Sequence, residues 1–302
     1  MSAGIVFSAN DAVLSWTLPF LTSLRAHNPD IPLALIPFDA DCEGVLDLAG
    51  RFGFTVFEDE SFGRLEAIGA RLELGHSSYG PHWFRRYAAF WGPFERFAYL
   101  DARQVILGDL TAFVEATATF GIDLAYYDTE LDQVYAPGPM RTRFLREGGA
   151  RGFNSGRWAS RRGLFTVDDF ETLVEAQMTV RSELNPRNTD QAFINHACDA
   201  HGVRMVKISD LLGDTVSSGW ARQKGRPYRD EEGVWRLWDH GGNDHRKRLL
   251  LMHWAGYQAG DLLPNGRLLR HFGGRLPVRW SRLARNCLAT NRTMRRLAGR
   301  PE

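Results

Sequence analysis

The stretch RFAYLDARQVILGDL, residues 96–110, joins an apolar run to a polar turn. The run FAYL has the character of a buried strand, and it ends at Asp101. A carboxylate two residues later would complete a D-x-D pair, which directs two oxygens toward a hard cation. The sequence has Arg103 there, and a guanidinium has no lone pair to give to a metal. The stretch therefore predicts a buried strand and leaves open whether its end can hold a metal ion.

Short runs of strand character alternate with helical patterns along the rest of the chain. The strand runs are 4–10, 33–38, 54–59, 97–101, 123–128, 203–209 and 249–254. Helical spacing marks 13–27, 167–178 and 189–202, and Gly202 closes the last of these. This order predicts an α/β fold with a mostly parallel sheet, whose ligands bind at the carboxyl ends of the strands.

Composition is typical of a folded globular protein. The 302 residues are 44% hydrophobic and 12% aromatic, which is enough for a sizeable core. The start, MSAGIVFSAN, is unlike a signal peptide, and no window has the ~18 apolar residues of a membrane span. The three cysteines are far apart and in no metal-type spacing, which favours a reducing compartment. We therefore expect a cytoplasmic protein.

The formal net charge of +1 hides an asymmetry between a body, 1–274, and a tail, 275–302. The tail has eight arginines and one acid, so the body has 29 basic and 35 acidic residues and a net charge of −6. An acidic body argues against a nucleic-acid partner. The tail pattern, apolar on one helical face and basic on the other, suits a helix lying on the inner face of a membrane. A terminal helix packed on the body or on a partner is the alternative.

Polar residues follow several of the predicted strands. Asn10 and Asp11 end the first strand, Asp101 ends FAYL, and His253 ends LLLM. Because the carboxyl ends of parallel strands share one edge of a sheet, we expect these side chains to converge on one site.

Short pieces of sequence occur in a characteristic order over residues 4–260. They are FSAND at 7–11, PHWFRRYAAFWGPF at 81–94 leading into YLDA at 99–102, FNSG at 153–156, TDQAFIN at 189–195 and HWAG at 253–256. Together they resemble the retaining glycosyltransferases of family 8, the glycogenin-like and lipooligosaccharide galactosyltransferase-like enzymes. The resemblance implies that 1–274 is a GT-A catalytic domain that binds a nucleotide sugar, with a Rossmann-like sheet flanked by helices.

The resemblance also implies an activity, which is transfer of a hexose from a UDP-sugar donor to an acceptor hydroxyl with retention. The acceptor would be a glycan, a lipid-linked glycan or a protein. Asp101 and His253 would hold Mn²⁺ or Mg²⁺ on the donor diphosphate. Asp190 and Gln191 would be catalytic, supporting the sugar while the leaving diphosphate helps to deprotonate the acceptor. The other donor-binding residues would be Ala9, Asn10, Asp11, Arg86, Ala102, Arg103, Asn154 and Gly156.

Physical chemistry gives reasons for these residue types. The departing diphosphate gains negative charge as the glycosidic bond breaks, and a divalent cation or fixed guanidinium groups must stabilise that charge. Asp-Gln at the start of a helix offers a carboxylate and an amide to sugar hydroxyls.

Two features that handle phosphates depart from the family's pattern. Arg103 replaces the second carboxylate, and Gln258 and Ala259 stand where the family usually has a lysine. In one account Arg103 pairs with a phosphate oxygen and substitutes for the metal. In a second, a metal is still bound and Arg103 turns away to an acid such as Asp109. In a third, the site has lapsed, and the protein binds a nucleotide sugar or a partner without transferring anything.

Other interpretations stay open beside these. A sugar nucleotidyltransferase should have a Gly-rich loop and a basic residue after the first strand, and SANDAVLSW has neither. His253 can be a strand-end histidine bonded to backbone, Asn154 a turn former, and Asp190 a first-turn acid of its helix. Asp39 and Asp41 form a second D-x-D that should lie beside the base. The tryptophans are assigned to packing: Trp83, Trp91, Trp158, Trp235 and Trp238.

Overall fold

The computed structural model describes residues 2–72, 80–127, 131–147, 152–187, 189–213, 216–222, 225–242, 245–258 and 261–274. The predicted basic tail, 275–302, lies outside these ranges, and so does its predicted membrane contact.

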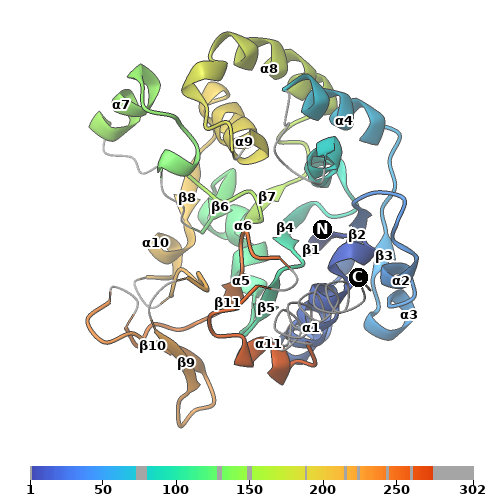
Figure 1. Cartoon of the computed structure of the whole chain (residues 1–302), viewed down its shortest axis with the longest axis vertical. Helices are drawn as coiled ribbons and strands as arrows, with labels where there is room; N and C mark the ends of the chain where they lie inside the picture. The colour runs from blue at the N-terminus through green and yellow to red at the C-terminus, as the bar shows by residue number, and fades with distance from the viewer. Residues whose placement is uncertain are drawn as a thin grey trace, which may run out of the picture.

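A seven-stranded sheet runs through the middle of the molecule (Figure 1), with strand order β3-β2-β1-β4-β7-β6-β8. Neighbouring strands are parallel except at β7, which is antiparallel to both β4 and β6. The strands are β1 (Ala3–Ala9), β2 (Leu33–Pro37), β3 (Thr55–Val56), β4 (Arg96–Asp101), β6 (Leu124–Tyr126), β7 (Arg157–Arg161) and β8 (Met205–Lys207). The predicted α/β fold with a mostly parallel sheet is confirmed.

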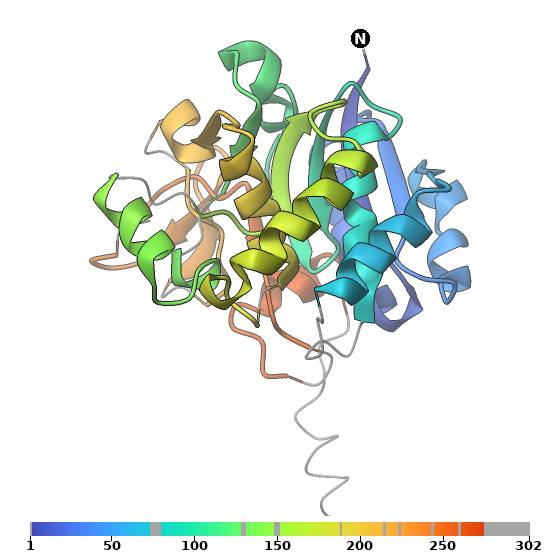
Figure 2. The ribbon, with the colours of Figure 1, turned by 90° about the horizontal axis from the view of Figure 1, so that it is seen from above.

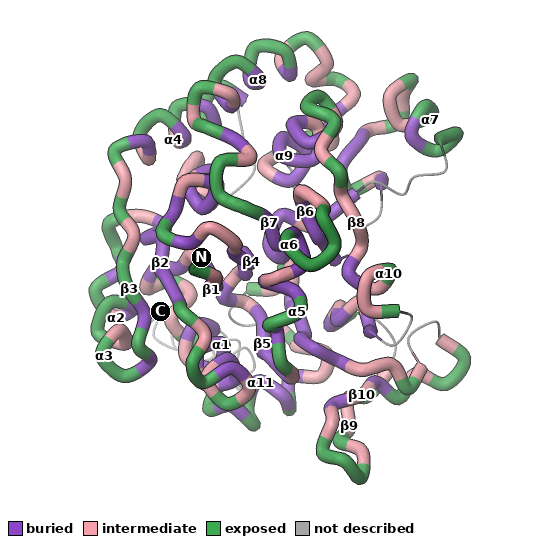
Figure 3. The backbone as a smooth tube through the Cα atoms, turned by 180° about the vertical axis from the view of Figure 1, so that it is seen from behind, coloured by how far each residue is buried: buried purple, intermediate pink, exposed green. Residues whose placement is uncertain are grey.

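Helices cover both faces of this sheet, and Figure 2 shows α4 (Phe62–Arg71), α8 (Val167–Thr179) and α9 (Thr189–Ala200) together on one of them. Successive residues of β1 serve the two faces, because side chains alternate along a strand. Ile5 and Phe7 pack in the core that includes Phe20 of α1, whereas Val6 packs with Phe84 on the other side. Figure 3 shows the inner strands of the sheet mostly buried, whereas the edge strand β3 and the outer turns of α4 and α8 are exposed.

One core lies under α1 (Leu14–His27), α5 (Thr111–Val114) and α6 (Ala116–Phe120), and the other under α4 (Phe62–Arg71), the 3₁₀ helix η2 (Gly80–Trp91), α8 (Val167–Thr179) and α9 (Thr189–Ala200). The other helices are η1 (Asp11–Val13), α2 (Glu43–Leu46), α3 (Ala49–Phe52), η3 (Leu131–Gln133), α7 (Pro139–Arg146), η4 (Arg181–Glu183), α10 (Ile208–Leu212) and α11 (Arg267–His271). The three predicted helices correspond to α1, α8 and α9.

Two strands depart from the sequence-based expectation. Our reading of the sequence assigned no strand to 157–161, yet β7 lies in the middle of the sheet. Its sequence, RWASR, has a charged residue at each end, and Arg157 is fully buried. The strand predicted at 249–254 exists as β11 (Leu251–His253). It pairs antiparallel with β5 (Gln104–Ile106) in a separate two-stranded sheet, rather than joining the main one.

The segment 213–247, predicted to be loop or hairpin, contains an antiparallel hairpin. Its strands are β9 (Arg226–Arg229) and β10 (Trp235–Trp238). Among the helices of the described residues, none combines the length and the apolar character needed to cross a bilayer.

We expect Asn28 to contribute strongly to the stability of the fold, although it lies away from the carboxyl ends of β1 and β4. It is 5% exposed, donates from Nδ2 to the carbonyl of Gly108 (3.0 Å) and accepts from the buried amide of Leu110 (2.8 Å). In Asn28→Ala the amide of Leu110 loses its partner, so we expect a loss of about 1–3 kcal/mol in unfolding free energy. Asn28→Asp keeps the acceptor for Leu110 but buries a carboxylate opposite the Gly108 carbonyl, so it should also lose stability. Denaturant titration measures both, and equal stability of all three proteins would contradict this prediction.

Candidate functional site

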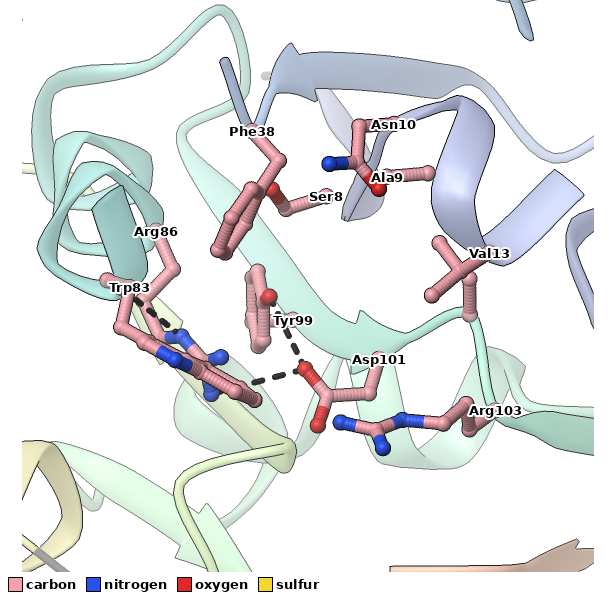
Figure 4. Close-up of a pocket in the computed structure, with 11 residues that line it drawn as sticks. Ser8, Ala9, Asn10, Val13, Phe38, Trp83, Arg86, Tyr99, Asp101 and Arg103 are labelled. Atoms are coloured by element: carbon pink, nitrogen blue, oxygen red, sulfur yellow. Dashed lines mark hydrogen bonds and ion pairs between the residues drawn. The ribbon is translucent and has the colours of Figure 1, made fainter. Parts of the chain in front are cut away.

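The carboxyl ends of β1 and β4 meet at a pocket (Figure 4). The two strands are parallel neighbours, and their register aligns Ser8 with Asp101. The cavity itself has a volume of about 40 Å³ and opens to solvent. The turns after the two strands line it through Ala9, Asn10, Ala102 and Arg103.

A buried arginine holds two carboxylates beside this pocket. Arg86 lies on η2 and is 2% exposed. Its Nη1 is 3.4 Å from Oδ1 of Asp101 and 3.5 Å from Oδ2 of Asp190. The guanidinium also donates to the carbonyls of Trp83 and Ser155, at 3.0 and 3.1 Å. We predicted that Arg86 would contact a phosphate or the donor sugar. It does line the pocket, but its contacts organise the two carboxylates.

The environment keeps Asp101 ionised. Burial works to raise the pKa of this carboxyl, and the nearby positive charges, Arg86 foremost and Arg103 also, outweigh it, so the pKa lies below its usual value. The Tyr99 hydroxyl adds a hydrogen bond to Oδ1 at 3.1 Å. Asp101 is therefore a charged acceptor at neutral pH, with part of its hydrogen-bonding capacity already used.

The turn 153–156 brings Asp190 to the site. The Ser155 hydroxyl donates to Oδ2 of Asp190 at 2.7 Å. Asn154 closes the turn, because its Oδ1 accepts from the amide of Gly156 at 3.0 Å. A Cβ on Gly156 would lie 2.3 Å from Oδ2 of Asp101, so only glycine lets the carboxylate approach this closely. The structure therefore gives Asn154 and Gly156 a role in shaping the site.

Gln191 is held away from the pocket by the same turn. It is 5% exposed, accepts from Asn154 Nδ2 at 2.9 Å and donates to the Gln133 carbonyl at 3.1 Å. The sequence led us to expect Gln191 as a catalytic partner of Asp190. In the structure these hydrogen bonds occupy both ends of its amide and position the turn, and its catalytic role stays a prediction.

Asn195 is the last residue of TDQAFIN, and the sequence predicted no role for it, but it anchors the turn 153–156 to α9. It is fully buried on α9. Its Oδ1 accepts from the amide of Phe153, and its Nδ2 donates to the Phe153 carbonyl, both at 2.9 Å. The side-chain amide of Asn195 thus makes the two backbone hydrogen bonds that a neighbouring strand would otherwise make with Phe153. Its position four residues after Gln191, one helical turn on, was the available signal.

His253 reaches the site from β11. Because β5 follows Asp101 directly and pairs with β11, His253 Nε2 lies 3.9 Å from Oδ2 of Asp101. The imidazole is stacked on Trp220, and neither ring nitrogen has a hydrogen-bond partner among the described residues. Burial, with Arg157 next in effect, holds the pKa of His253 well below its usual value, so the ring is neutral at neutral pH.

The side chains around Asp101 do not fit a site for Mn²⁺ or Mg²⁺. Asp101 and His253 could each give one ligand, and the unbonded ring nitrogens of His253 are the feature that would favour a metal. Within the described ranges, however, no three His, Cys, Asp or Glu side chains gather closely enough to hold a metal ion. Hard cations take about six ligands, mostly oxygen. The arginine that follows Asp101 also repels a cation.

Arg103 faces the pocket. Its Nη1 donates to the carbonyl of Tyr257 at 3.0 Å, and its guanidinium carbon is 5.8 Å from the centre of the Trp83 ring. Figure 4 shows the guanidinium beside the carboxylate of Asp101. The orientation of Arg103 thus differs from that in the second account, where it turns away to an acid such as Asp109, and the metal of that account stays a prediction. Asp109 accepts from the amide and hydroxyl of Thr111 instead.

The turn after β1 is held by two carboxylates. Asn10 is buried in the pocket wall and donates to Oδ2 of Asp39 at 2.7 Å, which places Asp39 of the second D-x-D beside this turn. Its place beside the base stays a prediction. Asp11 accepts from the amides of Gly44 and Val45, both at 2.9 Å. We expected Asp11 to hold the base. Both side-chain oxygens cap the start of α2 and so shape the turn, and the contact with the base stays a prediction.

Two aromatic residues that we did not select form a wall of the pocket. Trp83 and Phe38 line it, with ring centres 5.7 Å apart and planes at 89°. Trp83 also lies over the guanidinium of Arg86, at 4.6 Å. The spacing of three residues was the available signal, since residues i and i+3 eclipse in a 3₁₀ helix. The assignment of Trp83 to packing alone was incomplete.

Asp101 should make stability fall in acid. Because its folded pKa is lowered, its contribution is complete above the unfolded value of about 4 and is lost as the pH falls through the folded pKa. Asp101→Asn removes this titration, so its unfolding free energy should fall less between about pH 5 and pH 3. Denaturant unfolding at several pH values measures the difference, and parallel curves for the two proteins would contradict the assignment.

Gly156→Ala should displace Asp101, because its Cβ would overlap the carboxylate. We expect a loss of about 1–3 kcal/mol in unfolding free energy, typical of overpacking, and weaker ligand binding at the pocket. Gly63→Ala is the matched control. A Cβ at this position on α4 meets nothing within 4 Å, so stability should rise by up to about 1 kcal/mol. A fully stable Gly156→Ala would refute the close approach.

Comparisons with known proteins identify the fold of the chain that carries this site. No family model matches the sequence, and no curated protein matches it. Among solved structures, the bifunctional glycosyltransferase WbbM aligns with a TM-score of 0.52 and 11% identity, over 91% of this chain and 50% of the WbbM chain. This chain therefore spans half the length of that enzyme.

Galactosyltransferase LgtC, solved in complex with donor and acceptor sugar analogues, aligns with a TM-score of 0.51 and 15% identity, over 92% of this chain and 99% of LgtC. An active-site mutant of LgtC aligns with a TM-score of 0.53 at the same identity and coverage. Likeness at this level of identity shows architecture. The chain has the GT-A fold of these glycosyltransferases.

Proposed function

We propose that this protein is a glycosyltransferase that moves a hexose from a nucleoside diphosphate sugar to an acceptor hydroxyl. The observation that carries the proposal is the linked set Asp101–Arg86–Asp190 beside a pocket at the strand ends of a GT-A fold. Asp101 and Asp190 come from β4 and α9, and both lie within 3.5 Å of one guanidinium nitrogen. Such a pair of held carboxylates suits a sugar, whose hydroxyls need fixed acceptors.

We place the nucleotide in the pocket between β1 and β4. Phe38 and Trp83 offer faces to a flat base or a ribose, and the turn at Asn10 offers backbone and amide groups to the base. The pocket lies at the carboxyl ends of parallel strands, where nucleotides bind in α/β sheets. We propose UDP as the nucleotide. The donor and acceptor sugar analogues bound to LgtC support a donor and an acceptor here too.

The chemistry that we propose is a retaining substitution at the anomeric carbon. The bond from that carbon to the phosphate oxygen breaks as the bond to the acceptor oxygen forms, and the acceptor proton passes to the leaving diphosphate. Asp190 would stabilise the positive charge that develops on the sugar, since Ser155 and Arg86 hold its carboxylate in place. The acceptor would be a glycan, a lipid-linked glycan or a protein.

A sugar nucleotidyltransferase is the other enzyme class that we considered. The turn after β1 reads NDAV, with neither a glycine-rich loop nor a basic residue to cradle a triphosphate. The pocket instead presents aromatic faces and the carboxylate of Asp101, and Arg86 also holds Asp190, which favours a sugar-transfer site.

Release of UDP from a panel of UDP-hexoses, with and without simple sugar acceptors, tests the proposal. The wild-type chain should release UDP, and NMR should show that the product keeps the donor's anomeric configuration. Asp190→Asn should lower turnover by about 100-fold or more while nucleotide binding persists, because its charge acts mainly in the transition state.

The control is Asp168→Asn. Asp168 is also a first-turn acid of a helix, but its side chain is 79% exposed on α8 and it pairs with Arg64. Its turnover should match the wild type. A chain that binds UDP but releases none from any donor would leave the lapsed, non-catalytic account standing. Inverted product would refute retention.

A further inference from the structure

We propose that Arg103 supplies the positive charge that the donor diphosphate needs, so that the protein binds and uses its donor without a divalent cation. This inference rests on the proposed function, because it concerns the diphosphate of the same donor. It assigns a function to Arg103, the residue that breaks the D-x-D pattern. Of the three accounts that the sequence left open, it favours the first, in which Arg103 substitutes for the metal.

The position of Arg103 carries the first step. The residue lines the pocket together with Asn10 and Trp83, and Figure 4 shows its guanidinium directed to the carboxylate end of Asp101. One nitrogen is anchored on the Tyr257 carbonyl at 3.0 Å. The chain thus places a permanent cation next to the strand-end carboxylate, inside the cavity assigned to the nucleotide.

Asp101 already has a positively charged partner and a hydrogen-bond donor. Its Oδ1 lies 3.4 Å from Arg86 and accepts from Tyr99 at 3.1 Å. A carboxylate that already neutralises a buried guanidinium attracts a further cation less strongly. No third acid, histidine or cysteine joins Asp101 and His253 to complete a metal site in the described part of the chain.

The surroundings on the other side of Asp101 point the same way. Arg157 is fully buried in β7, with its guanidinium carbon 3.8 Å from the centre of the Trp220 ring. Trp220 in turn stacks on His253. Arg86 and Arg103 approach Asp101 from η2 and from the turn after β4, and Arg157 lies beyond Trp220 on the side of His253. A setting with three arginines favours an anion over a dication.

The chemistry of the guanidinium carries the last step. Its planar fork donates parallel N–H bonds to two phosphate oxygens, and it stays charged throughout the reaction. As the glycosidic bond breaks, negative charge grows on the leaving phosphate oxygen, and a fixed cation stabilises it there. Arg103 gives up no proton, so the acceptor proton still passes to the diphosphate and the reaction balances without a co-reactant.

Calorimetric titration of the full chain with UDP, and separately with inorganic pyrophosphate, tests this inference. Each titration is run once in EDTA and once in Mn²⁺. We expect both probes to bind with equal affinity, within about twofold, in the two conditions. Arg103→Ala should weaken both by at least tenfold, and Arg103→Lys, which keeps the charge but loses the fork, should lie between.

Arg222→Ala is the matched control. Arg222 lies over the Tyr257 ring, at 5.0 Å, and so contacts the residue that anchors Arg103, but it lies outside the pocket wall. Its binding should be unchanged. Arg103→Asp restores the D-x-D pattern next to His253, and we expect its UDP binding to become dependent on Mn²⁺. Thermal unfolding of each variant in the absence of ligand separates lost binding from lost folding.

The outcomes separate this inference from the proposed function. Binding of UDP only in Mn²⁺ would overturn the inference and leave the transferase proposal intact. Pyrophosphate binding in EDTA that depends on Arg103, without UDP binding, would support the inference and remove UDP as the donor nucleotide. No binding of either probe in either condition would overturn both. Unchanged binding in Arg103→Ala would also overturn the inference.

Discussion

The arrangement of the site depends on one buried charge, the guanidinium of Arg86. Arginine stays protonated at any ordinary pH, so a side chain that is 2% exposed must keep anionic partners. Its partners are Asp101 on β4 and Asp190 on α9, and Arg86 itself lies on η2. Three elements far apart in the sequence are therefore held in one relative position. An apolar residue here could be equally stable, so the ion set is better understood as fixing geometry than as adding stability.

The small and amide residues around the ion set follow from that constraint. Two carboxylates can share one guanidinium only if the chain between them stays out of the way, and Gly156 leaves the necessary space. Asn195 and Gln191 then hold the turn 153–156 against α9. The side-chain amide of Asn195 bonds to the backbone of Phe153, and that of Gln191 bonds to the side chain of Asn154. A polar network of this kind is rigid when each member has a partner. The rigidity serves the function we propose, because sugar hydroxyls need acceptors that do not move.

Two arginines at the same strand end have different physical roles because their partners differ. Arg86 is enclosed and neutralised by carboxylates, whereas Arg103 is anchored by a backbone carbonyl and faces the pocket. The first can organise the site but has little left for a ligand, and the second is placed to meet one. In the mechanism that we infer, a covalently fixed cation replaces one that would enter and leave with the diphosphate.

The sequence by itself determined the alternation of strands and helices, the mostly parallel sheet and the polar residues at the ends of β1 and β4, because these features depend on local periodicity and on residues adjacent in the chain. It did not reveal β7, since a strand with an arginine at each end lacks the apolar pattern, and its central place depends on pairing with β4 and β6. Nor did it show that Asp11 caps α2, that Trp83 lines the pocket or that Arg103 faces inward. Those orientations depend on hydrogen bonds and packing between segments distant in the sequence, and only the tertiary structure decided them.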